Sequence, residues 1–192
     1  MSTVGFRLRS KNYWKNKIKI TKSKPLLQLE KIYIIENNQT FEYDIDNNSL
    51  ILYLCLHNKS VIFIYNGVYD VDNYIIKRFL NGTINRKTRL KVVPSIDCKL
   101  SFIKLKKPII LAKKIKTEFN RHNNCFEIKI NLKHFFIQKI IDKLIKNKSR
   151  IFLGLTIETY KEDYLDEELL CIFGLNDTSD LLKSDSIHIA SN

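Results

Sequence analysis

The sequence predicts a mainly β protein with two or three short helices, α+β by content, arranged as a β-meander with a small barrel or sandwich. Two observations support this expectation. Clusters of turn-forming Asn, Asp and Gly recur about every nine to eleven residues, at 37–38, 46–48, 57–58 and 66–67. The runs between them are rich in Ile, Val, Tyr and Phe, which favour a pleated, half-buried surface. An OB-like barrel is our best specific hypothesis.

The segment 26–71 is predicted to form the meander, with strands over 31–36, 41–45, 50–57, 61–65 and 68–71. The run 50–57 is apolar at nearly every position, so we place it in the centre of the sheet with both faces covered. Asn66 and Gly67 both tolerate a positive φ, and we expect them to form the hairpin turn between 61–65 and 68–71.

The rest of the chain mixes strands and helices. Apolar residues at helical spacing after a capping Asp72 predict a helix over 72–80 that ends at Asn81-Gly82. Two or three strands are expected over 89–116, around Pro94 and Pro108. The clearest helical pattern covers 133–146, between predicted strands over 126–132 and 151–160. A third helix is predicted over 162–170.

Charge is distributed unevenly along the chain. The net charge is +13, but Ile, Lys and Asn make up 72 of the 192 residues, a bias typical of an AT-rich genome. Residues 1–155 carry a net charge of +20, whereas residues 156–192 carry −7. We therefore expect a basic β-rich domain over 1–160 and an acidic C-terminal helix and tail over 161–192. The acidic end either docks on its own basic body or regulates binding and recruits another protein.

Alternating basic and apolar residues near the N-terminus indicate a binding surface. If residues 13–20 are extended, Tyr13 shares one strand face with three lysines, and bases stack on aromatic rings while cations follow phosphates. A second basic cluster at 86–91 would extend this surface. The predicted nucleic-acid-binding residues are Arg7, Arg9, Tyr13, Lys15, Lys17, Lys19, Arg86, Lys87, Arg89 and Lys91. A solvated lysine face and an acidic protein partner are the alternatives.

Catalytic and metal motifs are sparse. The five glycines are isolated, so no phosphate-binding glycine loop is present, and the four histidines show no paired metal spacing. We expect no cofactor, no metal and no catalytic residue. A nuclease interpretation stays open because Glu127 and Lys129, with Asp97, resemble the Glu-x-Lys arrangement of restriction-like nucleases.

The cellular context is predicted from the cysteines and from hydropathy. Four widely spaced cysteines fit reduced thiols in a cytoplasmic or nuclear, non-secreted protein. No apolar run has the length needed to span a bilayer, so we expect no membrane partner.

These features lead to three functional hypotheses. The first is a non-catalytic accessory protein that binds single-stranded DNA or RNA in replication or transcription of an AT-rich virus, plasmid or parasite. The second is a structural or assembly protein such as a viral capsid subunit, for which homo-oligomers are expected. The third is the metal-dependent nuclease.

Overall fold

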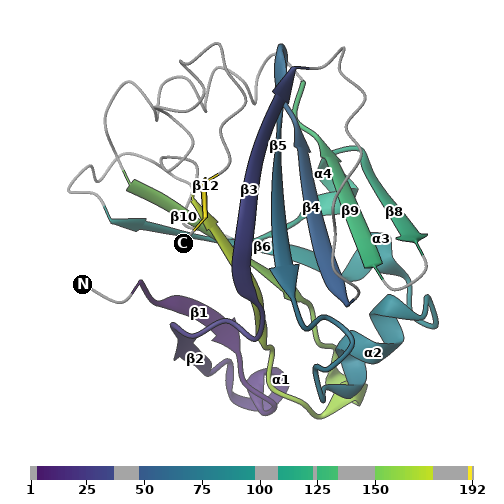
Figure 1. The fold of residues 1–192 in the computed structure, drawn as a ribbon. Coiled ribbons are helices and arrows are strands. Elements are labelled where there is room, and N and C mark those ends of the chain that lie inside the picture. Colours follow the sequence, from purple (N-terminus) through teal and green to yellow (C-terminus); the bar gives the residue numbers. More distant parts are fainter. Residues whose placement is uncertain are drawn as a thin grey trace.

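The computed structural model describes residues 4–36, 48–97, 108–122, 125–133, 150–174 and 190–191. Figure 1 shows two larger β-sheets, whose strands cross one another, and a small two-stranded sheet beside them. The predicted mainly β fold class is confirmed. No sheet closes on itself within the described ranges, so the OB-like barrel is not confirmed.

The larger sheet has six strands in the order β12-β3-β5-β4-β9-β8. The pair β4–β9 is parallel and the other neighbours are antiparallel. Alternate residues of β4 belong to two separate buried clusters, which confirms the predicted central strand covered on both faces. The strands are β3 (Gln28–Glu36), β4 (Ser49–Cys55), β5 (Lys59–Asn66), β8 (Thr117–His122), β9 (Cys125–Asn131) and β12 (Ala190–Ser191).

The second sheet has four antiparallel strands in the order β11-β10-β6-β7. They are β6 (Leu90–Asp97), β7 (Ile109–Ile110), β10 (Arg150–Ile157) and β11 (Leu169–Gly174). One large hydrophobic cluster contains residues of both sheets, so the main core lies between them. Pro94 is accommodated within β6, opposite Leu153 of β10.

Short helices connect the strands. They are α1 (Tyr13–Asn16), α2 (Tyr74–Leu80), α3 (Arg86–Arg89), α4 (Leu111–Lys114) and the 3-10 turn η1 (Lys161–Asp163). The prediction of a helix near 72–80 is confirmed by α2, whose apolar face is buried in the main core. Its N-cap is Asn73 and not Asp72, because the Asn73 side chain accepts hydrogen bonds from the backbone N–H groups of Ile75 and Ile76.

The strand order corrects the predicted meander. Strand β3 pairs with β5, and β5 then pairs with β4, so strands consecutive in the sequence are not consecutive in the sheet. The predicted hairpin at 66–67 is also wrong. Gly67 has φ of +83°, but its N–H donates to the carbonyl of Asn48 at the start of β4, and Val68 is buried in the core. The chain therefore leaves the sheet here and enters α2.

Two further predictions are corrected. The segment 162–170 is not a helix: η1 ends at Tyr164, which has φ of +50°, and β11 begins at Leu169. Residues 13–20 are not one extended strand, because α1 occupies its first half and Lys17 adopts a left-handed conformation. The predicted strand 41–45, and the predicted helix 133–146 from residue 134 on, lie outside the described residues.

Candidate functional site: a basic arm anchored by buried ion pairs

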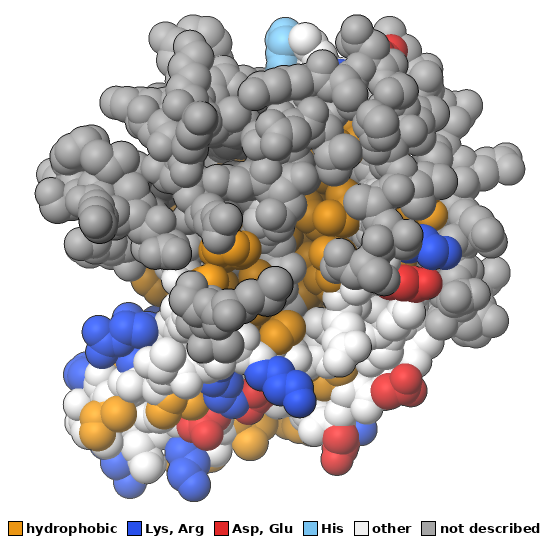
Figure 2. All heavy atoms as spheres, turned by 60° about the vertical axis from the view of Figure 1, so that its left-hand side comes forward, with side chains coloured by type: hydrophobic (Ala, Val, Ile, Leu, Met, Phe, Trp, Pro, Cys, Tyr) orange, Lys and Arg blue, Asp and Glu red, His pale blue; other side chains and the backbone are white. Residues whose placement is uncertain are grey.

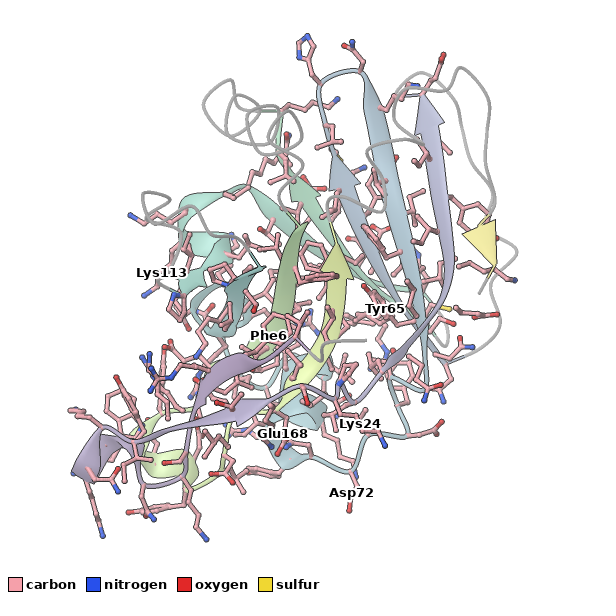
Figure 3. All side chains as sticks on the ribbon, turned by 90° about the vertical axis from the view of Figure 1, so that its left-hand side faces the viewer. Phe6, Lys24, Tyr65, Asp72, Lys113 and Glu168 are labelled. Carbon is pink, nitrogen blue, oxygen red and sulfur yellow. The ribbon has the colours of Figure 1, made fainter. Side chains whose placement is uncertain are left out.

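An N-terminal hairpin extends from the two larger sheets, and we call residues 4–24 the arm. It consists of β1 (Phe6–Arg9), α1 and β2 (Lys19–Lys22), and β1 and β2 pair antiparallel. Figure 3 shows the arm reaching away from the two larger sheets, with α1 at its far end. The inward side chains of β1, Phe6 and Leu8, are fully buried and form a small hydrophobic cluster with Val93 and Leu169. This cluster fixes the base of the arm on the four-stranded sheet.

Gly154 in β10 allows Phe6 to pack closely against the four-stranded sheet. A Cβ atom at this position would lie 2.6 Å from Cδ1 of Leu169 and 2.8 Å from Cδ1 of Phe6. Real Cβ contacts are longer than this, so any larger residue would push the arm or β11 away. The absence of a side chain at 154 therefore lets the Phe6 ring reach the sheet.

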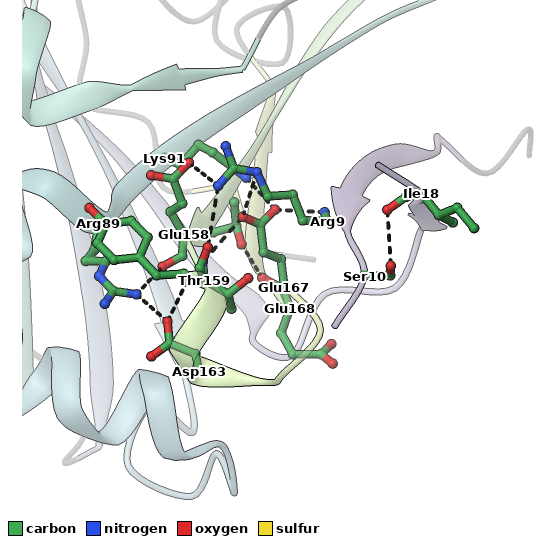
Figure 4. A network of polar contacts seen from close by, with 12 residues as sticks. Arg9, Ser10, Ile18, Arg89, Lys91, Glu158, Thr159, Asp163, Glu167 and Glu168 are labelled. Atoms are coloured by element: carbon green, nitrogen blue, oxygen red, sulfur yellow. Dashed lines mark hydrogen bonds and ion pairs between the residues drawn. The ribbon is translucent and has the colours of Figure 1, made fainter. Parts of the chain in front are cut away.

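Ion pairs add to the anchoring, as Figure 4 shows. The guanidinium Nη1 of Arg9 lies 2.7 Å from Oε1 of Glu158, and its Nε lies 4.0 Å from Oε1 of Glu167. The backbone N–H of Arg9 also donates to Oε2 of Glu167 at 2.9 Å. The N–H of Glu167 in turn donates to the backbone carbonyl of Arg9. Arg9 thus joins β1 to the acidic segment 158–168 through both its side chain and its backbone.

The same acidic segment neutralises two buried cations of the body. Lys91 pairs with Glu167, and both side chains are almost completely buried. Arg89 pairs with Asp163 and also lies over the ring of Tyr160, 3.5 Å from its centroid. Burial lowers the pKa of Lys91 below its ordinary value, and the negative charge of Glu167 opposes that shift. Charges this deeply buried are tolerated because each one has a partner.

The far end of the arm exposes apolar and basic side chains. Trp14 and Ile18 are 36% and 53% exposed, so two large apolar side chains lie at the surface of the arm. Four lysines surround them in the sequence, and within the described ranges none of the four forms an ion pair: Lys11, Lys15, Lys17 and Lys19. Figure 2 shows basic and hydrophobic side chains together at the lower left of the molecule, where the arm lies.

The aromatic rings of the arm carry cations on their faces. The guanidinium carbon of Arg9 lies 4.9 Å from the centroids of both Tyr13 and Trp14. The ammonium of Lys17 lies 5.4 Å and 5.6 Å from the same two centroids. A base that stacked on the same ring faces would have to displace these contacts. The aromatic surface expected from the sequence is therefore partly occupied by cations of the arm itself.

The ten predicted site residues fall into two groups. Arg7, Lys15, Lys17 and Lys19 are on the arm and have no ion-pair partner within the described ranges, while Lys87 is exposed on α3. The other five are engaged inside the protein. They are Arg9 and Tyr13 at the anchor, Arg89 and Lys91 in buried ion pairs, and Arg86, which donates to the backbone carbonyls of Phe79 and Leu80.

Sequence reasoning did not assign roles to the acidic partners. Glu158, Asp163 and Glu167 each pair with a basic residue more than 70 positions earlier in the chain, and Glu168 pairs with Lys22 of the arm. The available signal was the reversal of charge near residue 156, which raised the alternative that the acidic end docks on its own basic body. Its first part does so, as a loop and strand and not as a helix.

The three residues of the nuclease hypothesis come from two different sheets. Glu127 lies in β9 of the six-stranded sheet and accepts a hydrogen bond from the amide of Asn120, whereas Asp97 ends β6 in the other sheet. Among the described residues, no group of three or more His, Cys, Asp or Glu side chains is arranged to hold a metal ion. Cys55 and Cys171 are buried thiols, and burial raises the pKa of each.

Comparisons with known proteins give one match. A family model described as "Protein ENHANCED DISEASE RESISTANCE 2, C-terminal" matches residues 40–179. Searches against curated proteins and against solved structures gave no match. In the part of the chain that the structure describes, no helix is long and apolar enough to cross a membrane. The matched segment contains both larger sheets except β3 and β12, together with the acidic segment, and the arm precedes it.

This match corrects the functional hypotheses. A family named for a disease-resistance protein points away from a viral, single-stranded-DNA-binding accessory protein of replication or transcription, and away from a viral capsid subunit. The geometry agrees with the first correction for two of the predicted residues, because Arg89 and Lys91 are buried in ion pairs. Since the match spans well over half of its length, the chain belongs to the family of the C-terminal domain of Protein ENHANCED DISEASE RESISTANCE 2.

Proposed function

We propose that this protein is a non-catalytic module that docks on anionic membrane surfaces through the far end of its arm. The observation that carries the proposal is the pairing of exposed Trp14 and Ile18 with lysines that lack ion-pair partners within the described ranges. Tryptophan is favoured at the membrane interface, and basic residues are attracted to anionic headgroups. The expected absence of a membrane partner rested on spanning segments alone, and surface docking requires none.

The charges and the apolar surface of the arm are sufficient for a measurable affinity for anionic membranes. Each Lys or Arg near an anionic leaflet contributes about 1 kcal/mol, so Arg7 and the four lysines of the arm together supply about 5 kcal/mol. Burying on the order of 100 Å² of apolar surface from Trp14 and Ile18 adds roughly 2–3 kcal/mol. The sum corresponds to a dissociation constant of about 1–10 μM in accessible lipid. Docking of this strength is reversible and sensitive to salt.

The anchoring network contributes rigidity. Arg9, Phe6 and Leu8 hold the base of the arm on the sandwich, so the cations and apolar side chains at its end are presented in one arrangement. A preorganised surface loses less conformational entropy on binding than a flexible tail does. The predicted cytoplasmic location agrees with the proposal, since the cytoplasmic leaflet is rich in anionic lipids.

Co-sedimentation with vesicles tests the proposal. The wild-type protein is expected to bind vesicles that contain phosphatidylserine at about 50 mM salt, and to bind neutral phosphatidylcholine vesicles far more weakly. Replacing Lys11, Lys15 and Lys17 with Gln should weaken binding by about 100-fold, since about 3 kcal/mol is removed. Replacing Trp14 and Ile18 with Ala should weaken it about tenfold or more.

Matched controls come from exposed residues elsewhere. Replacing Lys87, Lys113 and Lys114 with Gln removes the same charge from α3 and α4, and Tyr74→Ala removes an aromatic ring that is 63% exposed. Both controls should bind vesicles nearly as well as wild type. Equal losses in the arm and control variants, or no preference for anionic vesicles, would overturn the proposal.

A further inference from the structure

A second cationic cluster lies away from the arm, where α2 ends and β8 comes alongside. Arg86, at the first position of α3, turns back to the C-terminus of α2. Its Nε donates to the carbonyl of Phe79 at 2.7 Å, and Nη2 donates to the carbonyl of Leu80 at 2.5 Å. The Phe79 carbonyl also accepts the backbone N–H of Gly82. The two bonds from Arg86 place a positive charge at the negative end of the helix dipole.

Space for this guanidinium depends on Gly82. A Cβ atom there would lie 3.3 Å from Nη2 of Arg86, and Gly82 has φ of +73°, a conformation that other residues rarely adopt. The guanidinium carbon of Arg86 also lies 4.9 Å from the centroid of the buried Phe126 ring. Arg86 is thus fixed by two carbonyl groups and an aromatic face.

Strand pairing brings a second arginine to the same place. Arg121 of β8 is opposite Phe126 of β9, so both side chains are on the inner face of the sheet. The neighbouring pair, Asn120 and Glu127, points to the outer face. Nη1 of Arg121 lies 3.5 Å from Oδ1 of Asn81, the residue that precedes Gly82. The two guanidinium groups therefore hydrogen-bond to adjacent residues at the end of α2.

Tyr69 adds a hydroxyl group to this cluster. The guanidinium carbon of Arg121 lies 5.5 Å from the centroid of the Tyr69 ring. The Tyr69 hydroxyl is shielded from solvent and is the buried side-chain oxygen or nitrogen atom without a hydrogen-bond partner among the described residues. Leaving a buried hydroxyl unpaired costs about 1–3 kcal/mol, so its retention needs an explanation.

No carboxylate neutralises this cluster within the described ranges, because none of their ion pairs involves Arg86 or Arg121. This contrasts with Arg9 and Arg89, which are both paired. Burial lowers the pKa of Arg86, and the nearby charge of Arg121 lowers it further. Two arginines of like charge therefore lie near a buried hydroxyl that has no hydrogen-bond partner among the described residues.

We propose that Arg86, Arg121 and Tyr69 form a binding site for a phosphate-class oxyanion, either free phosphate, a phosphomonoester, or such a group on a lipid headgroup. Guanidinium groups bind phosphate oxygens through paired N–H donors, and the Tyr69 hydroxyl supplies a further donor. Arg121 is exposed and held by a single long hydrogen bond, so its side chain can move to admit the anion. The site is separate from the arm and does not depend on the membrane proposal.

Calorimetric titration with inorganic phosphate tests the site. The wild-type protein should bind phosphate saturably, with one site and a dissociation constant of about 1 mM or lower. Arg121→Gln should weaken binding at least tenfold, because it removes charge-assisted hydrogen bonds. Tyr69→Phe removes the donor alone and should weaken phosphate binding several-fold, without lowering the melting temperature in phosphate-free buffer.

The chain offers a matched control pair. Arg78 lies 5.4 Å from the ring centroid of Tyr74 on α2, an arginine–tyrosine contact of the same kind at an exposed position. Arg78→Gln and Tyr74→Phe should leave phosphate affinity unchanged. No saturable binding by the wild type up to about 20 mM phosphate, or equal losses in the Arg121 and Arg78 variants, would overturn the proposal.

Two further binding experiments distinguish the sources of the oxyanion. If a lipid headgroup is the source, the wild type will prefer phosphatidic acid vesicles to phosphatidylserine vesicles of equal charge, and Arg121→Gln will abolish that preference. If a free phosphomonoester is the source, glycerol phosphate will bind in solution and the two vesicle types will bind equally. Either result, together with saturable phosphate binding, supports the site.

Discussion

Glu167→Gln is the sharpest test of how the arm is attached. The side chain of Glu167 is fully buried and accepts hydrogen bonds from the backbone N–H groups of Arg9 and Thr159, in addition to its ion pair with Lys91. Glutamine keeps the shape but removes the charge, so buried Lys91 loses its counter-ion. Breaking a buried pair by removing one partner costs about 3–5 kcal/mol.

The expected size of the effect is measurable. A loss of about 3 kcal/mol should lower the melting temperature by roughly 6–12 °C in a chain of this length. Circular dichroism during thermal and urea unfolding gives the change in stability. The double variant that adds Lys91→Met should recover most of the loss, because two apolar or neutral groups replace an unpaired charge.

The loss should also depend on pH. Burial already lowers the pKa of Lys91 below 10.5, and removing the negative charge of Glu167 lowers it further. The unfolded chain keeps the Lys91 proton up to its ordinary pKa, so between the folded and unfolded pKa values the unfolded state binds more protons. Stability of the variant should therefore rise with pH in that window, and its deficit should shrink from pH 7 towards pH 10. A deficit under about 0.5 kcal/mol, or no rescue by Lys91→Met, would refute the reasoning.

Two other predictions concern packing and thiol chemistry. Gly154→Ala should destabilise the protein by about 1–3 kcal/mol and expose β1 to proteolysis, since the new Cβ would meet Leu169 and Phe6 at 2.6 Å and 2.8 Å; an unchanged unfolding midpoint would contradict this. Cys171 should resist iodoacetamide in the folded protein and react only in urea, because burial raises its pKa and blocks access. Peptide mapping by mass spectrometry reports this, and rapid native labelling at Cys171 would refute it.

Local sequence patterns predicted the strands better than their order. The apolar runs at 50–57, 61–65 and 126–132 all correspond to strands, because β-branched and aromatic residues suit a buried pleated surface. The order β3-β5-β4 and the parallel pairing of β4 with β9 depend on contacts between distant segments. Hydrophobic periodicity carries no information about which strand lies beside which.

The burial of some predicted binding residues was hidden from the sequence for a related reason. Lys91 alternates with apolar neighbours as a solvent-facing lysine would, and only Glu167, 76 positions later, reveals that it is buried. Residues 13–20 were expected to form an extended strand, but the left-handed Lys17 closes a helical turn that leaves the Trp14 ring partly exposed. Recruitment of another protein by the acidic tail stays a prediction for residues 175–189, which lie outside the described residues.

The fluorescence of Trp14 tests the central proposal most directly. Trp14 is the single tryptophan of the chain, so its emission reports on the end of the arm without interference from other tryptophans. On addition of phosphatidylserine vesicles, the emission should shift to shorter wavelength and be quenched by lipids brominated near the headgroup, while neutral vesicles should cause little change. An emission spectrum that does not change with anionic vesicles at low salt would contradict docking through the arm.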